Sequence, residues 1–317
     1  MKIKLIIIAI IIITFLVVYI YQPQNMFEVT PINPGEITNI HGVNIGTDKL
    51  SPDVMLELTF GNINWVRLDA TNYTLQNMNF GYNYPYAGFR NIKILAILDY
   101  ATMNYQSFTL SQWNSTVKYF AETYTNVSAW EIWNEPTTHF LGFQDGSPYH
   151  YYLMLKSAYE IIKSINPNYI VVGFGGLYYS DLSFAKAVIS YGGLNYCDAI
   201  SLHFYPQFGS IGGFTMYTQE YKYTINSYAQ IIGNKPIWVT ETGIMSSNVT
   251  DYAENLGNQT QYINTIIPLF KSFDITNIFW YDLYDSQFCI PPVAGPWGLM
   301  TYNGTLKPSY YAWKNVA

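Results

Sequence analysis

Hydrophobic and polar residues change their spacing along this chain in a regular order. From residue 37 onward, short runs of β-branched and aromatic residues are separated by longer stretches in which apolar residues recur at helical spacing. That order is typical of βα units and a parallel sheet. The pattern predicts eight strands: Ile40–Ile45, Ile63–Asp69, Ile92–Asp99, Ala129–Asn134, Tyr169–Phe174, Ala199–Tyr205, Pro236–Thr240 and Asn277–Leu283.

Helices are predicted between these strands, with capping residues and prolines at their ends. The unit after the second strand is the weakest, because residues 71–90 are rich in Tyr, Asn and Gly and favour at most a short helix. No repeat or second linker interrupts the pattern, so the sequence predicts a single (β/α)8 TIM barrel over residues 37–317. The predicted helices are Ser51–Phe60, Ser111–Tyr124, Ser147–Ile165, Asp181–Tyr191, Thr218–Ile232, Asn255–Phe273 and Ser309–Val316.

The N-terminus has the pattern of a membrane segment. Lys2 and Lys4 precede an uncharged apolar run that extends to about residue 24, long enough to cross a bilayer. Because no small-residue cleavage site follows the run, we favour a transmembrane anchor over residues 1–24 and a linker over 25–36. The remainder would lie outside the cell, attached to the membrane, or secreted if the segment is cleaved as a signal peptide.

Composition narrows the class of partner. Charged residues make up 11% of the chain and the formal net charge is −6, so nothing indicates a basic surface for nucleic acid. A neutral polysaccharide or oligosaccharide fits better than a polyanion. Asn-x-Ser/Thr sequons are compatible with an extracellular glycoprotein. They begin at Asn72, Asn114, Asn126, Asn248, Asn258 and Asn303.

The two cysteines give little support for a disulfide or a metal site. Cys197 precedes a predicted strand and Cys289 follows another, which places them at opposite ends of a barrel. That separation would exceed the roughly 7 Å limit between bridged Cα atoms. Without spaced Cys or His partners, a zinc site is not predicted either. We therefore expect no metal and no cofactor; the oligomeric state is left open.

Two glutamates stand where the active sites of such barrels lie. Glu135, in Trp-Glu-Ile-Trp-Asn-Glu-Pro, ends the fourth predicted strand, and Glu241, in Trp-Val-Thr-Glu-Thr-Gly, ends the seventh. The carboxyl ends of barrel strands share one mouth. Two carboxylates facing one cleft are what glycoside hydrolysis requires, one to protonate the leaving oxygen and one to attack the anomeric carbon.

These motifs resemble the clan A glycoside hydrolases, retaining (β/α)8 enzymes that include family 5-like cellulases and family 39-like β-xylosidases. The resemblance covers nearly the whole predicted barrel. It implies that Glu135 is the acid/base, that Glu241 is the nucleophile and that Asn134 binds the sugar 2-hydroxyl. The Asn-Glu-Pro motif alone is weak, and its value here comes from the second glutamate three strands later.

The same resemblance assigns supporting roles to residues on two other strands. Arg67, in Trp-Val-Arg-Leu-Asp, would bind the nucleophile and keep it ionised; the alternative is an arginine bound to a structural carboxylate deep in the barrel. His203 and Tyr205 are two residues apart and so share a strand face. The resemblance implies that this pair lines the sugar subsite and that Tyr205 donates to the nucleophile.

The aromatic residues of strand eight and Glu131 on strand four are further candidates for the site. Strand eight, Phe-Trp-Tyr-Asp, offers an aromatic platform for a sugar; we expect Trp280 to form it, with Tyr281 as the alternative register. Glu131 shares a strand face with Glu135 but lies deeper, which favours a buried ionic role.

We therefore expect an O-glycosyl hydrolase that cleaves β-linked neutral glycans by double displacement, in the manner of an endo-β-glucanase or mannanase. The alternatives are an exo-acting β-glucosidase or β-xylosidase, a transglycosylase, and a non-catalytic carbohydrate-binding protein of the cell envelope. A metal-dependent hydrolase is a further alternative, which a chelator would test.

Overall fold

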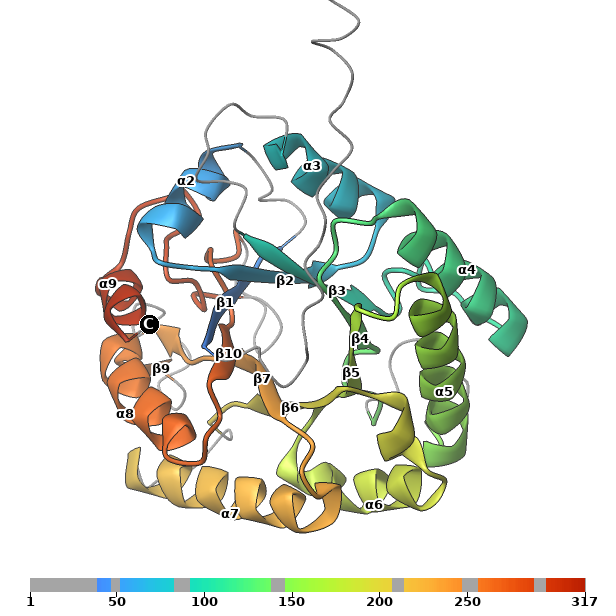
Figure 1. Ribbon diagram of the computed structural model, residues 1–317. Coiled ribbons are helices and arrows are strands. Elements are labelled where there is room, and N and C mark those ends of the chain that lie inside the picture. The colour runs from blue at the N-terminus through green and yellow to red at the C-terminus, as the bar shows by residue number, and fades with distance from the viewer. Residues whose placement is uncertain are drawn as a thin grey trace, which may run out of the picture. The chain divides into compact units, whose positions relative to one another are not determined.

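The eight predicted strands form one closed parallel barrel, in the order β1-β10-β7-β6-β5-β4-β3-β2 (Figure 1). The computed structural model describes residues 39–46, 52–82, 92–137, 146–206, 214–246, 256–287 and 295–316. All of them belong to a single compact unit, residues 33–317. The barrel strands are β1 (Ile40–Asn44), β2 (Trp65–Asp69), β3 (Lys93–Leu98), β4 (Ala129–Ile132), β5 (Ile170–Leu177), β6 (Ala199–Phe204), β7 (Ile237–Thr242) and β10 (Asn277–Trp280).

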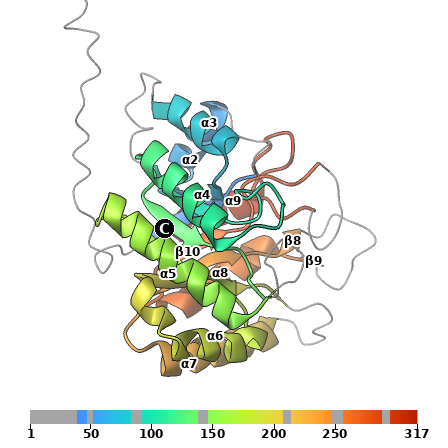
Figure 2. The same ribbon diagram turned by 90° about the vertical axis from the view of Figure 1, so that its right-hand side faces the viewer.

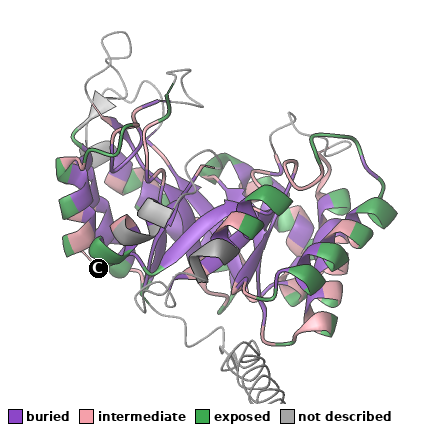
Figure 3. Ribbon diagram, turned by 90° about the horizontal axis from the view of Figure 1, so that it is seen from above, coloured by how far each residue is buried: buried purple, intermediate pink, exposed green. Residues whose placement is uncertain are grey.

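Helices surround the barrel, and α3 to α7 follow one another along one flank (Figure 2). The strands are buried on both faces, whereas the helices expose their outer sides (Figure 3). A short parallel pair, β8 (Met245–Ser246) and β9 (Leu256–Gly257), stands apart from the barrel. The helices are α2 (Pro52–Phe60), α3 (Asn72–Tyr82), α4 (Leu110–Thr123), α5 (Pro148–Ile165), α6 (Leu182–Ser190), α7 (Phe214–Ile232), α8 (Gln259–Lys271) and α9 (Pro308–Asn315).

Aromatic side chains fill the amino end of the barrel. The rings of Trp65 and Trp238 meet edge to face at 5.7 Å, and Phe279 lies beside both. Gly42 faces this layer, where a Cβ atom would come within 2.3 Å of the Phe279 ring, so only glycine fits there. This closed floor leaves the carboxyl end of the barrel as the open end.

The unit after β2 differs from its prediction, because α3 is an eleven-residue helix. Its polar composition hid two signals. Thr71 and Thr74 exchange hydrogen bonds between side chains and backbone at its start, as residues at helix N-termini commonly do. Leu75 and Met78, three residues apart, are both buried in the core. Tertiary packing therefore stabilises a helix that propensity alone disfavours.

The fifth strand is longer than predicted, since β5 continues to Leu177 instead of ending at Phe174. Its pairing with β6 is irregular between Gly173 and Leu177, and Phe174, Gly175 and Gly176 all have positive φ. At Gly176 a Cβ atom would lie 2.1 Å from the His203 ring. The bulge thus lets a site histidine lie against the β5 backbone and carries residue 178 to the mouth.

The predicted membrane segment, 1–24, and the linker, 25–36, lie outside the described residues, as do Cys289 and the sequon at Asn248. Within the described ranges, no helix combines the length and apolar character needed to cross a bilayer. Cys197 is buried with a free thiol.

Candidate active site

A cavity of about 1110 Å³ opens at the carboxyl end of the barrel. It exceeds the roughly 300–1,000 Å³ typical of small-ligand pockets. Six of the seven residues that the sequence singled out line it: Arg67, Asn134, Glu135, His203, Tyr205 and Glu241.

Arg67 organises the floor of this cavity. Its Nε donates to Glu131 at 2.5 Å, and one terminal nitrogen donates to both Asn44 at 2.8 Å and Glu241 at 2.5 Å. The other terminal nitrogen donates to Asn134 at 2.9 Å. Burial alone would lower the pKa of Arg67, but the charges of Glu131 and Glu241 outweigh it and raise the pKa. The guanidinium therefore stays charged and fixes four side chains, which come from β1, from β7, from β4 and from the segment just after β4.

Glu241 faces the cavity because of an extra residue in β7. Val239 pairs with Leu202, but the next β6 residue, His203, pairs with Glu241, so Thr240 is inserted. This bulge turns both Thr240 and Glu241 toward the barrel interior, where strict alternation would allow only one. Glu241 then accepts hydrogen bonds on both oxygens, from Arg67 and, at 2.6 Å, from Tyr205.

Glu131 has the buried ionic role that its depth predicted. Its side chain is fully buried, and its Oε2 atom pairs with Arg67. Its Oε1 atom accepts from the hydroxyls of Ser201 at 2.6 Å and Thr240 at 3.0 Å. Since every oxygen of this glutamate is committed below the cavity, it anchors Arg67 and has no access to a ligand.

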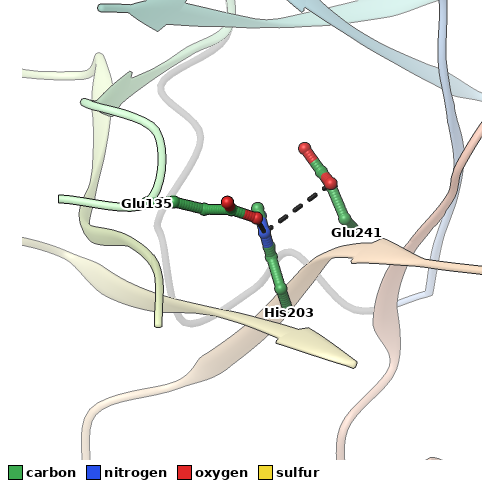
Figure 4. Close-up of side chains that lie close together, drawn as sticks. All are labelled: Glu135, His203 and Glu241. Carbon is green, nitrogen blue, oxygen red and sulfur yellow. Dashed lines mark hydrogen bonds and ion pairs between the residues drawn. The ribbon is translucent and has the colours of Figure 1, made fainter. Parts of the chain in front are cut away.

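Glu135 lies across the cavity from Glu241, with His203 between them (Figure 4). The His203 Nδ1 atom is 2.9 Å from Glu135 Oε1 and 3.6 Å from Glu241 Oε2. One oxygen of Glu135 and one of Glu241 lie within 4.8 Å of each other. Oxygens this close are easier to reconcile with the roughly 5–5.5 Å between the carboxyl groups of retaining glycosidases than with the roughly 6.5–9.5 Å of inverting ones.

His203 connects Glu135 to a buried polar network. Ser201, Thr240 and Glu131 Oε1 form a triangle of short oxygen contacts. The His203 Nε2 atom lies 3.1 Å from the Thr240 hydroxyl, and its Nδ1 atom lies 2.9 Å from Glu135 Oε1. Both ring nitrogens of His203 are therefore within hydrogen-bond distance of an oxygen.

Tyr178 is a site residue that the sequence reasoning missed. Its hydroxyl donates to Glu135 Oε1 at 2.5 Å, and its backbone is held by Tyr228 and Asp181. Burial raises the pKa of Glu135, but the hydrogen bonds from His203 and Tyr178 outweigh burial and lower it overall. The Gly-Gly pair before Tyr178 was the available signal, because it marks a bulge in β5.

Trp280 is not in the cavity, which corrects the predicted aromatic platform. Phe279 faces the barrel interior beside Gly42, so alternation turns Trp280 outward, where it is fully buried against Tyr262 and Trp313. Its indole N–H donates to the Trp297 carbonyl. Tyr281, the alternative register, lines the cavity together with Tyr205 and Trp297, as edge-to-face rings.

Glu135, His203 and Glu241 also satisfy a distance test for a metal site, since one donor atom from each lies within 4.8 Å of the others. A metal site was not predicted from the sequence. A cation bound there would have to replace the hydrogen bonds from Arg67 and Tyr205 to Glu241 and the contact between His203 and Glu135. The possible metal ligands are thus already engaged in contacts with other side chains.

No protein-family model matches the sequence, and no curated protein is detectably similar to it in sequence. Solved structures do match. A family 39 glycoside hydrolase from Bacteroides cellulosilyticus WH2 aligns with a TM-score of 0.66 at 20% identity, over 90% of this chain and 64% of that one. A Faecalibacterium prausnitzii β-glucuronidase aligns at 0.64 and 13% identity, over 88% of this chain and 48% of that one.

A family 2 β-galacturonidase from Eisenbergiella tayi, bound to galacturonate, aligns at a TM-score of 0.61 and 16% identity over 88% of this chain and 50% of that one. The chain therefore spans about half to two thirds of the length of these proteins. The (β/α)8 fold of clan A glycoside hydrolases, which the sequence motifs predicted, is the fold of this chain.

Proposed function

We propose that this chain is a retaining glycoside hydrolase that cleaves β-linked glycans with Glu241 as nucleophile and Glu135 as acid/base. One observation carries the proposal: the two carboxylates face each other with oxygens within 4.8 Å, and only Glu241 is held by a guanidinium. A group that attacks as an anion benefits from a fixed positive partner, and a group that exchanges protons benefits from a histidine.

In the first step, the Glu241 carboxylate forms a bond to the anomeric carbon as the glycosidic bond breaks. Glu135 gives its proton to the leaving oxygen and is left as a carboxylate, with His203 Nδ1 2.9 Å from its Oε1 atom. Arg67 takes the oxygen of the Asn134 amide, which leaves the amide N–H groups to bind the sugar 2-hydroxyl. In the second step, Glu135 removes a proton from water, which attacks the anomeric carbon and releases Glu241.

An extended substrate suits the size and rim of the cavity, which favours endo action on a neutral glucan, mannan or xylan. Tyr179 lines the cavity, and its ring meets that of Tyr223 edge to face at 5.0 Å. Both tyrosines are exposed, at 39% and 58%. Aromatic faces beside the cleft would bind sugar units beyond the cleavage point. Exo action on a terminal glucose or xylose is the alternative, and product analysis on oligosaccharides of defined length separates the two.

The test is a panel of aryl β-glycosides and β-glucans, mannans and xylans assayed with the wild type, Glu135→Gln and Glu241→Gln. Loss of the general acid should lower kcat/KM by about 10² to 10⁴-fold, and loss of the nucleophile by more. Aryl glycosides with a good leaving group should be spared by Glu135→Gln and not by Glu241→Gln. Full activity of either variant would refute the mechanism.

Three controls separate the other readings of this site. A 2-fluoro sugar inactivator should label Glu241, and a label on another residue would overturn its role as nucleophile. An unchanged rate in chelator is expected, since protons and Arg67 occupy the possible metal donors. Products at high acceptor concentration distinguish hydrolysis from transglycosylation. A protein that binds glycans without cleaving any member of the panel would be a non-catalytic carbohydrate-binding barrel.

We also propose that the barrel is held at the outer face of a membrane by residues 1–24. The apolar run after two lysines supports this placement. Fractionation of cells that express the full chain, with protease added from outside, tests it: a membrane-bound and externally digested barrel is expected. Recovery of the protein in the cytosol would contradict the proposal.

A further inference from the structure

Asp69 is a second polar residue on β2, closer to the carboxyl end of the strand than Arg67. It ends the strand, two residues after Arg67, and pairs in register with Ile97 of β3. Side chains two apart point to the same face, and each residue advances the strand by about 3.3 Å. Asp69 therefore projects into the barrel nearer its mouth than Arg67 does, and it lines the cavity.

The Asp69 carboxylate has no donor from the described part of the protein. Its backbone oxygen accepts from the Thr74 hydroxyl, but no described group hydrogen-bonds the side chain. Burial raises the pKa of Asp69, and the charge of Arg67 only partly offsets that effect. The Asp69 side chain is half-buried at the cavity, so a ligand that covers it has to supply hydrogen-bond donors.

A neighbouring acid shows the same deficit. Asp99, just after β3, is fully buried, and its Oδ1 atom accepts from the backbone N–H of Ala101 at 2.9 Å. Its Oδ2 atom is buried without a partner among the described residues. Burial, reinforced by the charge of Asp69, raises the pKa of Asp99 well above its usual value. Asp99 does not itself line the cavity, so Asp69 is the acid of this pair that a ligand can reach.

The charge of the cavity limits which donors can enter. Among the described lining residues Arg67 is the one Lys or Arg side chain, and Glu131 and Glu241 already pair with it. A sugar carboxylate would thus meet repulsion, and no described lining residue offers it an unpaired Lys or Arg, whereas sugar hydroxyls bring donors. The lining carboxylates are Asp69, Glu135, Glu220, Glu241 and Asp282.

We propose that Asp69 binds hydroxyl groups of the substrate sugar and that the cavity accepts neutral sugars while it rejects uronic acids. This inference rests on the proposed function for the kind of ligand, a glycan, but not on turnover. Asp69 is then a specificity-determining residue: a carboxylate accepts from a hydroxyl and repels another carboxylate.

The experiment measures binding, so that it succeeds or fails independently of hydrolysis. Glu135→Gln and the double variant Glu135→Gln/Asp69→Asn are titrated by calorimetry with cellotetraose, mannotetraose, xylotetraose and tetragalacturonic acid. At least one neutral oligosaccharide should bind Glu135→Gln, and Asp69→Asn should weaken that binding by about 10- to 100-fold. Tetragalacturonic acid should bind at least 100-fold more weakly than the best neutral ligand.

A matched control is Asp198→Asn in the same background. Asp198 pairs with Lys163 at the amino end of β6, so its loss removes a carboxylate far from the mouth and should leave binding unchanged. Thermal unfolding of each variant checks that it is folded. Binding of tetragalacturonic acid as tight as that of the neutral ligands, or a double variant that binds like Glu135→Gln, would overturn the inference. So would the absence of binding by every neutral oligosaccharide.

Failure of the proposed function has a different signature. If neutral oligosaccharides bind and Asp69→Asn weakens them, but Glu135→Gln and Glu241→Gln match the wild type in hydrolysis, the mechanism fails and the Asp69 inference stands. If both glutamate variants lose activity while Asp69→Asn leaves binding and kcat/KM unchanged, only the Asp69 inference fails.

Discussion

Carboxylates on the two sides of the barrel differ in how many of their oxygens accept hydrogen bonds. On the β4, β6 and β7 side, Glu131 and Glu241 have both oxygens hydrogen-bonded, to Arg67, two hydroxyls and Tyr205. On the β2 and β3 side, the Asp69 side chain and one Asp99 oxygen lack donors from described residues. The first arrangement fixes charges before a ligand arrives, as electrostatic catalysis requires. In the second arrangement Asp69, which lines the cavity, has hydrogen-bonding capacity that a ligand can use. Under the proposed function, catalysis and sugar recognition would take place on different sides of one cavity.

Arg67→Lys should produce the largest loss of stability and activity, because it breaks the hydrogen bonds that hold Glu131 and Glu241. A lysine is a single flexible point charge and cannot bind Glu131, Asn44, Glu241 and Asn134 together. We expect a loss of about 3–5 kcal/mol in the free energy of unfolding, as for other broken buried ion pairs. The rate should fall on the order of 10³-fold. Urea unfolding and kcat/KM measure the two.

The control for Arg67→Lys is Lys118→Met, which removes an exposed helical pair with Glu122 and should cost about 0.5 kcal/mol or less. Equal stabilities of the two variants would mean that the network around Arg67 does not stabilise the barrel.

Asp99→Asn should change the pH dependence of stability, because it replaces a buried carboxylate that has one oxygen without a donor among the described residues. Burial raises the pKa of Asp99 in the folded state, so between its unfolded pKa, about 3.9, and its folded pKa the folded protein binds more protons than the unfolded chain. Stability therefore falls as pH rises through that window, by up to about 1.4 kcal/mol per pH unit. Asparagine should remove this slope and stabilise the protein at neutral pH.

Urea unfolding between pH 4 and 8 measures that slope for the wild type, Asp99→Asn and Asp198→Asn. Asp198 has partners in Lys163 and the backbone N–H of Val171, so its replacement should destabilise the protein. If Asp99→Asn destabilises it as much, Asp99 is satisfied in solution and the contrast between the two sides of the barrel disappears.

Tyr178→Phe should have the smallest effect, a shift in pH dependence with the fold unchanged. The Tyr178 hydroxyl helps to hold the pKa of Glu135 below its usual value, so its loss should raise that pKa. The alkaline limb of kcat/KM, which reports the acid of the free enzyme, should move to higher pH. A lower kcat/KM without a shift of the limb would show that Tyr178 positions Glu135 without affecting its proton.

Much of the frame could be predicted from the sequence because the signals are local. Short runs of β-branched and aromatic residues located all eight strands, and the order of the strands placed Glu135 and Glu241 at one mouth. Predictions failed where the local pattern was broken. Three positive-φ residues extended β5 and brought in Tyr178, and the segment after β2, predicted to contain at most a short helix, contains the eleven-residue α3.

The register between β1 and β10 decides which residue of β10 faces the cavity. Phe279 packs against Gly42 of β1, so Trp280 points away from the barrel interior and Tyr281 lines the cavity. Asp69 follows Arg67 at the spacing that puts both inside, yet only the folded barrel reveals that Arg67 has partners and Asp69 does not.

The sequence alone determined the barrel, its open end and the two glutamates, since alternation and strand order are properties of neighbouring residues. The tertiary structure decided which carboxylates are satisfied. Glu131 and Glu241 receive Arg67 from 64 and 174 residues away, and Asp69 receives no donor from any described residue. Hydrogen bonding of a buried charge depends on partners that meet only in the folded barrel, and that is why the sequence does not specify it.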